Sequence, residues 1–319
     1  MERVPATIHK CNVSGTLRPL FLTLRKSFIS KQAAAFGDVS SIYTLDQYNE
    51  NNPYSGNTTY LKNVSANTIS ALKAAGPDAV WLIQDWLFYS SETFWTNDRI
   101  EAYLGGVSNN DMLILDLFSE SQPHWQRTNN YYGKPWIWCQ LHDYGGNMSL
   151  YGQVENVTID PIAALADKSS TMVGMGLTME GQETDPANEV MYDILLDQAW
   201  SGKPIDTATY FSKWVTTRYS GAKSLPAGLY SAWDTLRQNV YNNTNLSTAT
   251  AVTKSIFELA PNTTGLLNRT GHHPTTIQYD PSMLVDAWRE FYGAVAEEPT
   301  LWEDEAYTAD LTDIVRMND

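Results

Sequence analysis

Short apolar runs alternate with helical patterns over the first 200 residues of the chain, and this alternation limits the fold more than any other feature. The runs are rich in β-branched and aromatic residues, as strands are, and lie at 41–45, 79–84, 112–118, 136–141 and 172–178. The helical patterns lie at 18–36, 60–75, 97–104, 150–165 and 187–200. Strands that are apolar on both faces and separated by helices are typical of a parallel sheet. We therefore predict an α/β fold.

Polar or aromatic side chains follow each predicted strand. They are Asn49 and Glu50, Asp85 and Trp86, Asp116 and Glu120, His142 and Asp143, and Glu180. A (β/α)8 barrel collects functional groups at the C-terminal ends of successive strands, whereas an open doubly wound sheet does so only at its switch point. No glycine-rich phosphate loop follows any strand, which disfavours a nucleotide-binding sheet. We predict a (β/α)8-type (TIM) barrel, and because five strands are too few to close one, a barrel truncated on its N-terminal side.

The character of the sequence changes after residue 200. The run Gly-Lys-Pro at 202–204 is typical of a linker, and only helical patterns follow it, at 207–219, 227–241, 281–296 and 304–316. We predict two domains: a partial catalytic barrel over 1–200 and a partial C-terminal α-helical domain over 201–319.

The net charge of −15 and a pI near 4.7 limit the possible partners. Phosphate groups would be repelled, so we expect neither nucleic acid nor an anionic membrane surface as a partner. No apolar stretch is long enough to span a bilayer.

Nine Asn-X-Ser/Thr sequons indicate passage through a secretory compartment, since chance would supply fewer in this composition. The N-terminal residues nevertheless contain no apolar segment of the kind found in a signal peptide. The two signals point in opposite directions.

Glu50 and Glu180 bound a stretch that is dense in Trp, Tyr and Phe, and this combination suits hydrolysis of a glycosidic bond. That reaction needs two carboxyl groups, and flat aromatic rings stack on sugars. The aromatic residues that follow strand ends are the candidates for such stacking: Trp86, Trp125 and Tyr144. Those in or beside strands are predicted to be core: Trp81, Trp95, Trp136 and Trp138.

Two acidic residues after the third strand have more than one role open to them. Asp116 suits a hydrogen bond to a sugar hydroxyl or to a catalytic carboxylate, but a buried, internally satisfied aspartate fits equally well. For Glu120 the sequence favours a supporting, hydrogen-bonding role over a catalytic one.

His142 and Asp143 are adjacent, which raises the question of a metal site. Zinc normally takes three or four protein ligands, and no HExxH motif occurs in the chain. We predict that the site uses no metal and no cofactor. The absence of a Gly-X-Ser-X-Gly run also argues against a serine hydrolase.

Several runs occur together in one order and carry a specific resemblance. They are YNE (48–50), VWLIQDWLF (80–88), LDLFSESQP (115–123), WCQLHDYGGN (138–147), MVGMG (172–176), EG (180–181) and NEV (188–190). Together they resemble the α-N-acetylglucosaminidases, glycoside hydrolase family 89. The helical part, with VDAWR at 285–289, is similar to that family's C-terminal domain, though less distinctively.

The resemblance implies a small N-terminal domain, a (β/α)8 barrel and a helical domain, of which this chain resembles the later part of the barrel and part of the helical domain. By motif, Glu50 matches the family's general acid/base and Glu180 its nucleophile. The remaining site positions are taken as substrate-binding: Asn49, Trp86, Asp116, Leu117, His142 and Tyr144. Asp85 is a departure, because some members have glycine in a Gln-Gly-Trp run; a larger side chain there is expected to narrow the subsite or displace Trp86.

The chemistry agrees with two enzyme carboxylates. In an α-linked N-acetylglucosamine the acetamide lies on the same face as the leaving group, so it cannot attack from behind, and the enzyme must supply the nucleophile. The expected partner is a glycan with a terminal α-N-acetylglucosamine, and the family implies a secreted or lysosomal/vacuolar location. The alternative is a catalytically inactive, truncated carbohydrate-binding or vestigial relative.

Overall fold

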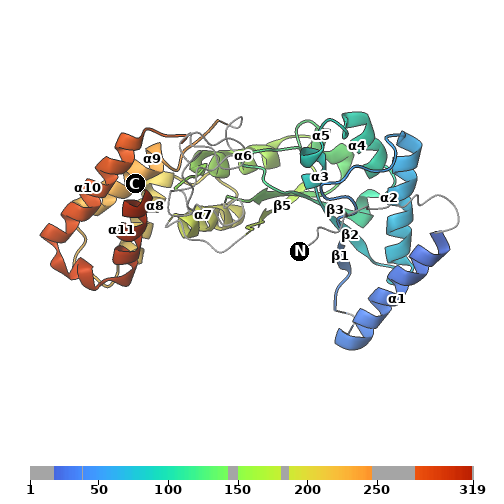
Figure 1. Cartoon of the computed structure of the whole chain (residues 1–319), viewed down its shortest axis with the longest axis horizontal. Coiled ribbons are helices and arrows are strands. Elements are labelled where there is room, and N and C mark those ends of the chain that lie inside the picture. The colour runs from blue at the N-terminus through green and yellow to red at the C-terminus, as the bar shows by residue number, and fades with distance from the viewer. Residues whose placement is uncertain (1–17, 38, 143–149, 181–186, 246–276, 318–319) are drawn as a thin grey trace, which may run out of the picture. The chain divides into compact units, whose positions relative to one another are not determined.

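The computed structural model describes residues 18–37, 39–142, 150–180, 187–245 and 277–317 (Figure 1). Five strands form one sheet in the order β1-β2-β3-β4-β5. Their bounds are β1 Ile42–Thr44, β2 Val80–Gln84, β3 Met112–Asp116, β4 Trp136–Gln140 and β5 Met172–Leu177. Residue Ile42 pairs with Val80 and Trp81 pairs with Met112, both in parallel. The predicted parallel sheet is therefore confirmed, with each strand one or two residues shorter than expected.

Helices connect the strands. Their bounds are α1 Arg18–Phe36, α2 Thr58–Lys73, α3 Trp86–Ser90, α4 Asn97–Leu104, α5 Asn129–Gly133, α6 Val154–Ala166 and α7 Asn188–Ser201, with a 3₁₀ turn at Asn109–Asp111. Five of them were predicted from the sequence. The sequence pattern does not predict α3 and α5, which have five residues each, because so short a helix shows no apolar period.

The described chain divides into two compact units. Unit 1 comprises the residues up to Asp116 together with His124–Ile137 and Ser169–Val173, and unit 2 comprises Leu117–Pro123, Trp138–Lys168 and the residues from Gly174 onward. The division cuts through β4 and β5, so the units do not coincide with single stretches of sequence.

Large aromatic side chains form the core of unit 1. Trp81, Trp95 and Tyr103 are buried and meet edge to face or tilted, with ring centroids 5.2 to 6.1 Å apart. Phe88 of α3 packs edge-on against Trp95 at 5.3 Å. Such contacts add to the burial of apolar area and fix ring orientations. The four tryptophans predicted to be core, which include Trp136 and Trp138, are all fully buried.

The C-terminal part of unit 2 is helical, as predicted. Its elements are α8 Thr207–Arg218, α9 Ala227–Asn239, α10 Pro281–Glu297, a 3₁₀ turn at Pro299–Glu303 and α11 Glu305–Met317. Asp206 and Asp280 cap α8 and α10 by accepting hydrogen bonds from backbone N–H groups two residues on, which satisfies donors that a helix start leaves free. Trp233, Phe291 and Tyr307 are buried between these helices.

An ion pair between the half-buried Arg218 and the buried Asp310 ties α8 to α11. The Arg218 guanidinium donates from Nε and Nη2 to the two carboxylate oxygens of Asp310, at 2.6 and 2.7 Å. The Tyr219 hydroxyl donates to Asp310 at 2.7 Å and accepts from the indole N–H of Trp233, also at 2.7 Å. Every partner is therefore hydrogen-bonded, which a buried pair requires.

No helix among the described residues combines the length and the apolar character needed to cross a membrane.

Of the sequons, Asn156 is buried and its side-chain N–H donates to the Glu120 carbonyl at 2.9 Å, so the folded chain leaves no room for a glycan there.

Removing the Asp310 carboxylate should destabilise the protein strongly. Asp310→Ala removes the acceptor that Arg218 and Tyr219 share and leaves Arg218 only its pair with the exposed Glu189, and we expect the free energy of unfolding to fall by about 3 kcal/mol in urea denaturation. The matched control is Asp286→Ala, which breaks the exposed Asp286–Arg289 pair and should cost less than about 1 kcal/mol. Equal losses in the two variants would contradict this account of the buried pair.

Candidate active site

The loop after β1 carries Asn49 and Glu50, and several hydrogen bonds hold its first half in place. The indole N–H of Trp81 donates to the Leu45 carbonyl at 2.9 Å. The amide of Gln47 donates to Thr68 at 2.8 Å and accepts from the Tyr103 hydroxyl at 2.9 Å. These hydrogen-bond partners come from β2, α2 and α4, so three elements position the loop.

Helix α3 contacts the tip of this loop at both of its ends. The indole N–H of Trp86, its first residue, donates to Oε1 of Glu50 at 3.2 Å. The hydroxyl of Ser90, its last residue, donates to the Asn49 carbonyl at 3.3 Å. Asn49 has φ of 49°, a left-handed conformation that asparagine tolerates better than most residues. Glu50 and Asn49 are exposed and Trp86 is half-buried, so the three predicted site residues lie together at the surface of unit 1.

Asp85 precedes α3 and is buried in unit 1. Its N–H donates to the Leu115 carbonyl at 3.0 Å, and its own carbonyl accepts from Phe88 at 2.7 Å. Its Oδ2 accepts from the Tyr131 hydroxyl at 2.8 Å and lies 3.1 Å from Nδ1 of His124. The side chain that departs from the family pattern is thus held in the interior of unit 1.

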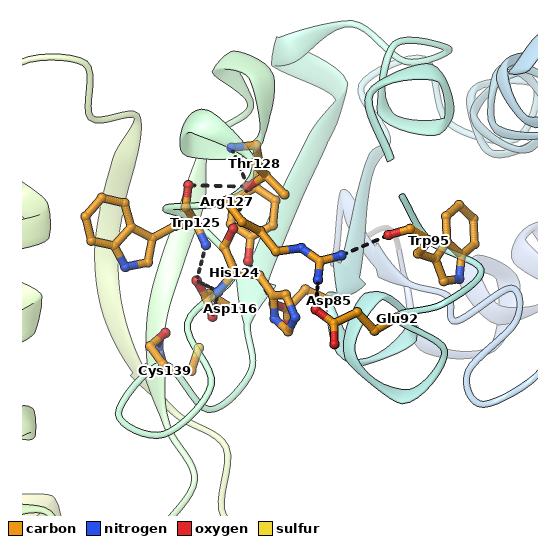
Figure 2. A network of polar contacts seen from close by, with 11 residues as sticks. Asp85, Glu92, Trp95, Asp116, His124, Trp125, Arg127, Thr128 and Cys139 are labelled. Carbon is orange, nitrogen blue, oxygen red and sulfur yellow. Dashed lines mark hydrogen bonds and ion pairs between the residues drawn. The ribbon is translucent and has the colours of Figure 1, made fainter. Parts of the chain in front are cut away.

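Asp116, at the end of β3, is also fully buried. Its Oδ2 accepts from the backbone N–H groups of His124 and Trp125, at 3.2 and 3.0 Å (Figure 2). The sequence left two roles open for Asp116, a contact with the sugar or the catalytic carboxylate and a buried, internally hydrogen-bonded aspartate. The contacts observed here are those of the second. Burial raises the pKa of the Asp116 carboxyl well above its ordinary value, and the nearby charge of Asp85 raises it further.

His124 lies between the two aspartates. Burial lowers the pKa of His124, but the hydrogen bond that its ring donates to Asp85 and the charges of Asp85 and Asp116 outweigh this effect, and the net pKa is raised. The raised pKa favours the imidazolium form, which matches the negative charge of Asp85. Neither His124 nor Tyr131 was singled out from the sequence, because only the fold brings them to Asp85.

Tyr131 sits in an unusual turn. Asn129, Asn130, Tyr131, Tyr132 and Gly133 all have positive φ, between 48° and 86°, so the segment labelled α5 is a left-handed turn. A left-handed conformation costs roughly 1–2 kcal/mol for each residue with a side chain. Backbone of this kind persists only where surrounding contacts impose it, and it concentrates at functional sites.

Asp85, Asp116 and His124 bring three possible metal-ligating atoms within 4.8 Å of one another. They come from three separate segments of the sequence, none of which includes the adjacent pair His142 and Asp143. Both carboxylates already accept hydrogen bonds from protein donors, and Nδ1 of His124 faces Asp85. These contacts suit an internal hydrogen-bond network.

Unit 2 holds the other predicted residues. The Glu120 carboxylate accepts from the backbone N–H groups of Leu141 and His142 at 2.9 and 2.7 Å, which is the supporting role favoured for it. These bonds fix His142 with φ of 62°, and its buried ring packs edge-on against Tyr192. Leu117 is also buried.

Glu180 is exposed and lies three residues beyond the end of β5. The backbone just before it is held to β4, since Thr178 N–H donates to the Gln140 carbonyl at 2.9 Å. Asp143 and Tyr144 lie outside the described residues. Trp125 is half-buried, and one face of its ring stacks on Trp136 with the ring centroids 5.6 Å apart, so that face is covered.

Comparison with known proteins identifies the family. The model of the α-N-acetylglucosaminidase (NAGLU) tim-barrel domain matches residues 4–202, which is more than half of the chain, and the model of the C-terminal domain matches residues 210–318. The chain belongs to the α-N-acetylglucosaminidase family. The resemblance seen in the sequence is therefore confirmed, as is the barrel class of the sheet.

A relative of known sequence supports the assignment. Human α-N-acetylglucosaminidase is 34% identical over 301 residues, which cover 94% of this chain and 38% of the human protein. The chain thus spans less than half the length of this member of the α-N-acetylglucosaminidase family.

Solved structures show the same fold. They include the family 89 glycoside hydrolase of Clostridium perfringens in complex with PUGNAc and with 2-acetamido-1,2-dideoxynojirmycin, each with a TM-score of 0.76 at 24% identity. A third is a form of that enzyme with two glutamates replaced by glutamine, in complex with its substrate GlcNAc-alpha-1,4-galactose. Each match covers 93% of this chain and 31% of the other.

The buried Asp116 carboxyl predicts a pH dependence of stability. Its pKa is raised on folding, so the folded chain keeps a proton that the unfolded chain loses above about pH 4. The stabilising contribution is full below that pH and is lost as the pH rises toward the folded pKa. Asp116→Asn should therefore flatten the decline of the unfolding free energy above pH 4, measured by urea denaturation. A decline as steep as in the wild type would contradict the assignment.

Proposed function

We propose that this chain carries both catalytic carboxylates of a retaining α-N-acetylglucosaminidase, with Glu50 as general acid/base and Glu180 as nucleophile. The substrate is a glycan with a terminal α-linked N-acetylglucosamine. Family membership and the name of the human relative support this reaction class. The C. perfringens neighbour, bound to GlcNAc-alpha-1,4-galactose with two glutamates replaced, is consistent with a pair of glutamates and with an α-linked sugar.

The environment of Glu50 is the observation that carries the proposal. Glu50 is exposed, and one carboxylate oxygen accepts from the Trp86 indole at 3.2 Å. An acid that must protonate a leaving group needs a fixed orientation and access to the substrate, and this arrangement provides both. The half-buried Trp86 ring places an apolar surface beside the carboxylate, as sugar binding requires.

The reaction proceeds in two steps that exchange the role of Glu50. In the first, the ionised Glu180 attacks the anomeric carbon while Glu50 gives its proton to the glycosidic oxygen. The bond between the anomeric carbon and the glycosidic oxygen then breaks. In the second, Glu50 takes a proton from water, the water oxygen attacks the same carbon, and Glu180 leaves as a carboxylate. Two displacements retain the α configuration.

The residues predicted to bind the sugar differ in solvent exposure, and we assign their roles accordingly. We infer that Asn49 and Trp86 contact the sugar directly, because Asn49 is exposed and Trp86 is half-buried beside Glu50. Asp116, Leu117 and His142 are buried, and supporting roles behind the sugar-binding surface suit them better. Residues 1–200 would supply the chemistry, and residues 201–319 would form a C-terminal α-helical domain. The sequons favour a secretory location for the enzyme.

Replacing either glutamate should impair turnover, but to different extents. With 4-nitrophenyl α-N-acetylglucosaminide at pH 4 to 7, Glu180→Gln should show no release of nitrophenol, because no nucleophile remains. Glu50→Gln should lower kcat/KM by about 10²–10⁴-fold. Glu101→Gln, an exposed glutamate of α4, is the matched control and should retain wild-type activity.

Two results would contradict the proposal. One is turnover that survives Glu180→Gln, and the other is a wild-type chain that is folded by circular dichroism and hydrolyses nothing. In the second case, calorimetric binding of GlcNAc-alpha-1,4-galactose by the inactive chain would establish the alternative, a carbohydrate-binding relative.

A further inference from the structure

We propose that Asp85, together with Tyr131 and His124, positions the acid/base Glu50 by fixing the start of α3 and the indole of Trp86. The inference rests on the proposed function, since it assigns Glu50 the acid/base role. Asp85 does not touch the substrate in this account. It acts through Trp86.

The first step is that α3 holds the loop that carries Glu50. Trp86 at its start reaches the Glu50 carboxylate, and Ser90 at its end reaches the Asn49 carbonyl. A helix of five residues has little stability of its own, because it completes barely one turn. Its orientation must therefore be set by contacts outside the helix.

The second step is that Asp85 supplies those contacts. Its backbone is bonded on both sides, to Leu115 of β3 and to Phe88 of α3. Its carboxylate forms no capping bond to α3 and is instead directed to the Tyr131 hydroxyl, 46 positions away in the chain, and to His124. A buried carboxylate held by two partners fixes the position of its own Cα and hence of the next residue, Trp86.

The third step is that both partners are themselves anchored. The left-handed turn holds Tyr131, whose N–H donates to the Thr128 hydroxyl at 3.2 Å. The segment that carries His124 is held through Arg127, which donates to Glu92 at 2.5 Å and to the Trp95 carbonyl at 2.9 Å (Figure 2). The network is therefore tied both to the left-handed turn and to the segment that directly follows α3.

A second path reaches the same indole. The ring of His124 packs edge-on against Tyr89, with centroids 6.0 Å apart, and Tyr89 packs against Trp86 at 5.2 Å. His124 thus bears on Trp86 both through Asp85 and through Tyr89. Both paths lie within unit 1 and end at the donor to Glu50.

Nuclear magnetic resonance tests the positioning without any need for activity. The indole N–H of Trp86 is assigned by its disappearance in Trp86→Phe, and Glu50→Gln should shift its resonance because the acceptor changes. We expect Glu50→Gln to cause no shift of this resonance when it is introduced into Asp85→Ala. In Tyr131→Phe, which removes one hydroxyl and leaves the ring, Glu50→Gln should cause a smaller shift. Tyr132→Phe removes the neighbouring hydroxyl of the same turn, which bonds to Asn97, and should leave the shift unchanged.

Leaving-group dependence tests the consequence for catalysis. Phenyl α-N-acetylglucosaminide needs protonation as it leaves, whereas the 2,4-dinitrophenyl glycoside does not. Misplacing the acid should lower kcat/KM for the phenyl substrate about 10- to 100-fold in Asp85→Ala, with little change in KM and little effect on the dinitrophenyl substrate. Asp85→Asn, which still accepts a hydrogen bond, should recover part of the loss.

The outcomes separate the two proposals. Selective loss with the phenyl substrate and loss of the indole shift support the positioning role. Equal loss with both substrates, or an indole shift that survives Asp85→Ala, overturns it. If Asp85→Ala does not fold, the same two measurements are compared between Tyr131→Phe and Tyr132→Phe. An effect in Tyr131→Phe alone supports the positioning role, and equal effects overturn it. A wild-type chain that hydrolyses neither substrate contradicts the proposed function, and the indole shift alone then decides the positioning role.

Discussion

The parallel hydrogen-bond ladder that joins β1, β2 and β3 is the constraint on which the candidate site depends. In a parallel sheet all the carboxyl ends lie at one edge, so residues far apart in sequence emerge side by side. The register of Ile42 with Val80 brings the loop of Glu50 beside the start of α3, and the register of Trp81 with Met112 sets the end of β3 next to the end of β2. The contact between Trp86 and Glu50 follows from that register, and it places an aromatic surface next to an exposed carboxylate.

The ionisable groups buried near the carboxyl ends of these strands must have their desolvation cost offset. Burying Asp85, Asp116 and His124 removes ionisable groups from water, which is costly unless hydrogen bonds and opposite charge compensate. Asp85 faces His124 and Tyr131, and Asp116 faces two backbone N–H groups, so each group has compensation. In the helical part, Arg218 and Asp310 follow the same rule. There the pair joins two long helices, whereas behind the edge the network orients one short helix.

Much of the fold was accessible from the sequence, because long apolar runs and helical periods report burial directly. The five strands and the long helices were found in this way, and the motifs gave the family. The network around Asp85 was not accessible, since its members become neighbours only after β2, β3 and the following segment align. The left-handed turn at Tyr131 was missed for a related reason: tyrosine does not favour positive φ, so nothing local predicts it. Propensity describes what a segment prefers, and here contacts made at a distance prevail.

The most direct test of the account follows the configuration of the first product. The folded chain is mixed with 4-nitrophenyl α-N-acetylglucosaminide, and the anomeric proton of the released sugar is observed by nuclear magnetic resonance before mutarotation. The account predicts that α-N-acetylglucosamine appears first and the β-anomer later, because two successive displacements through Glu180 retain configuration. The β-anomer as first product would mean direct attack by water and would contradict the assignment of Glu180 as nucleophile.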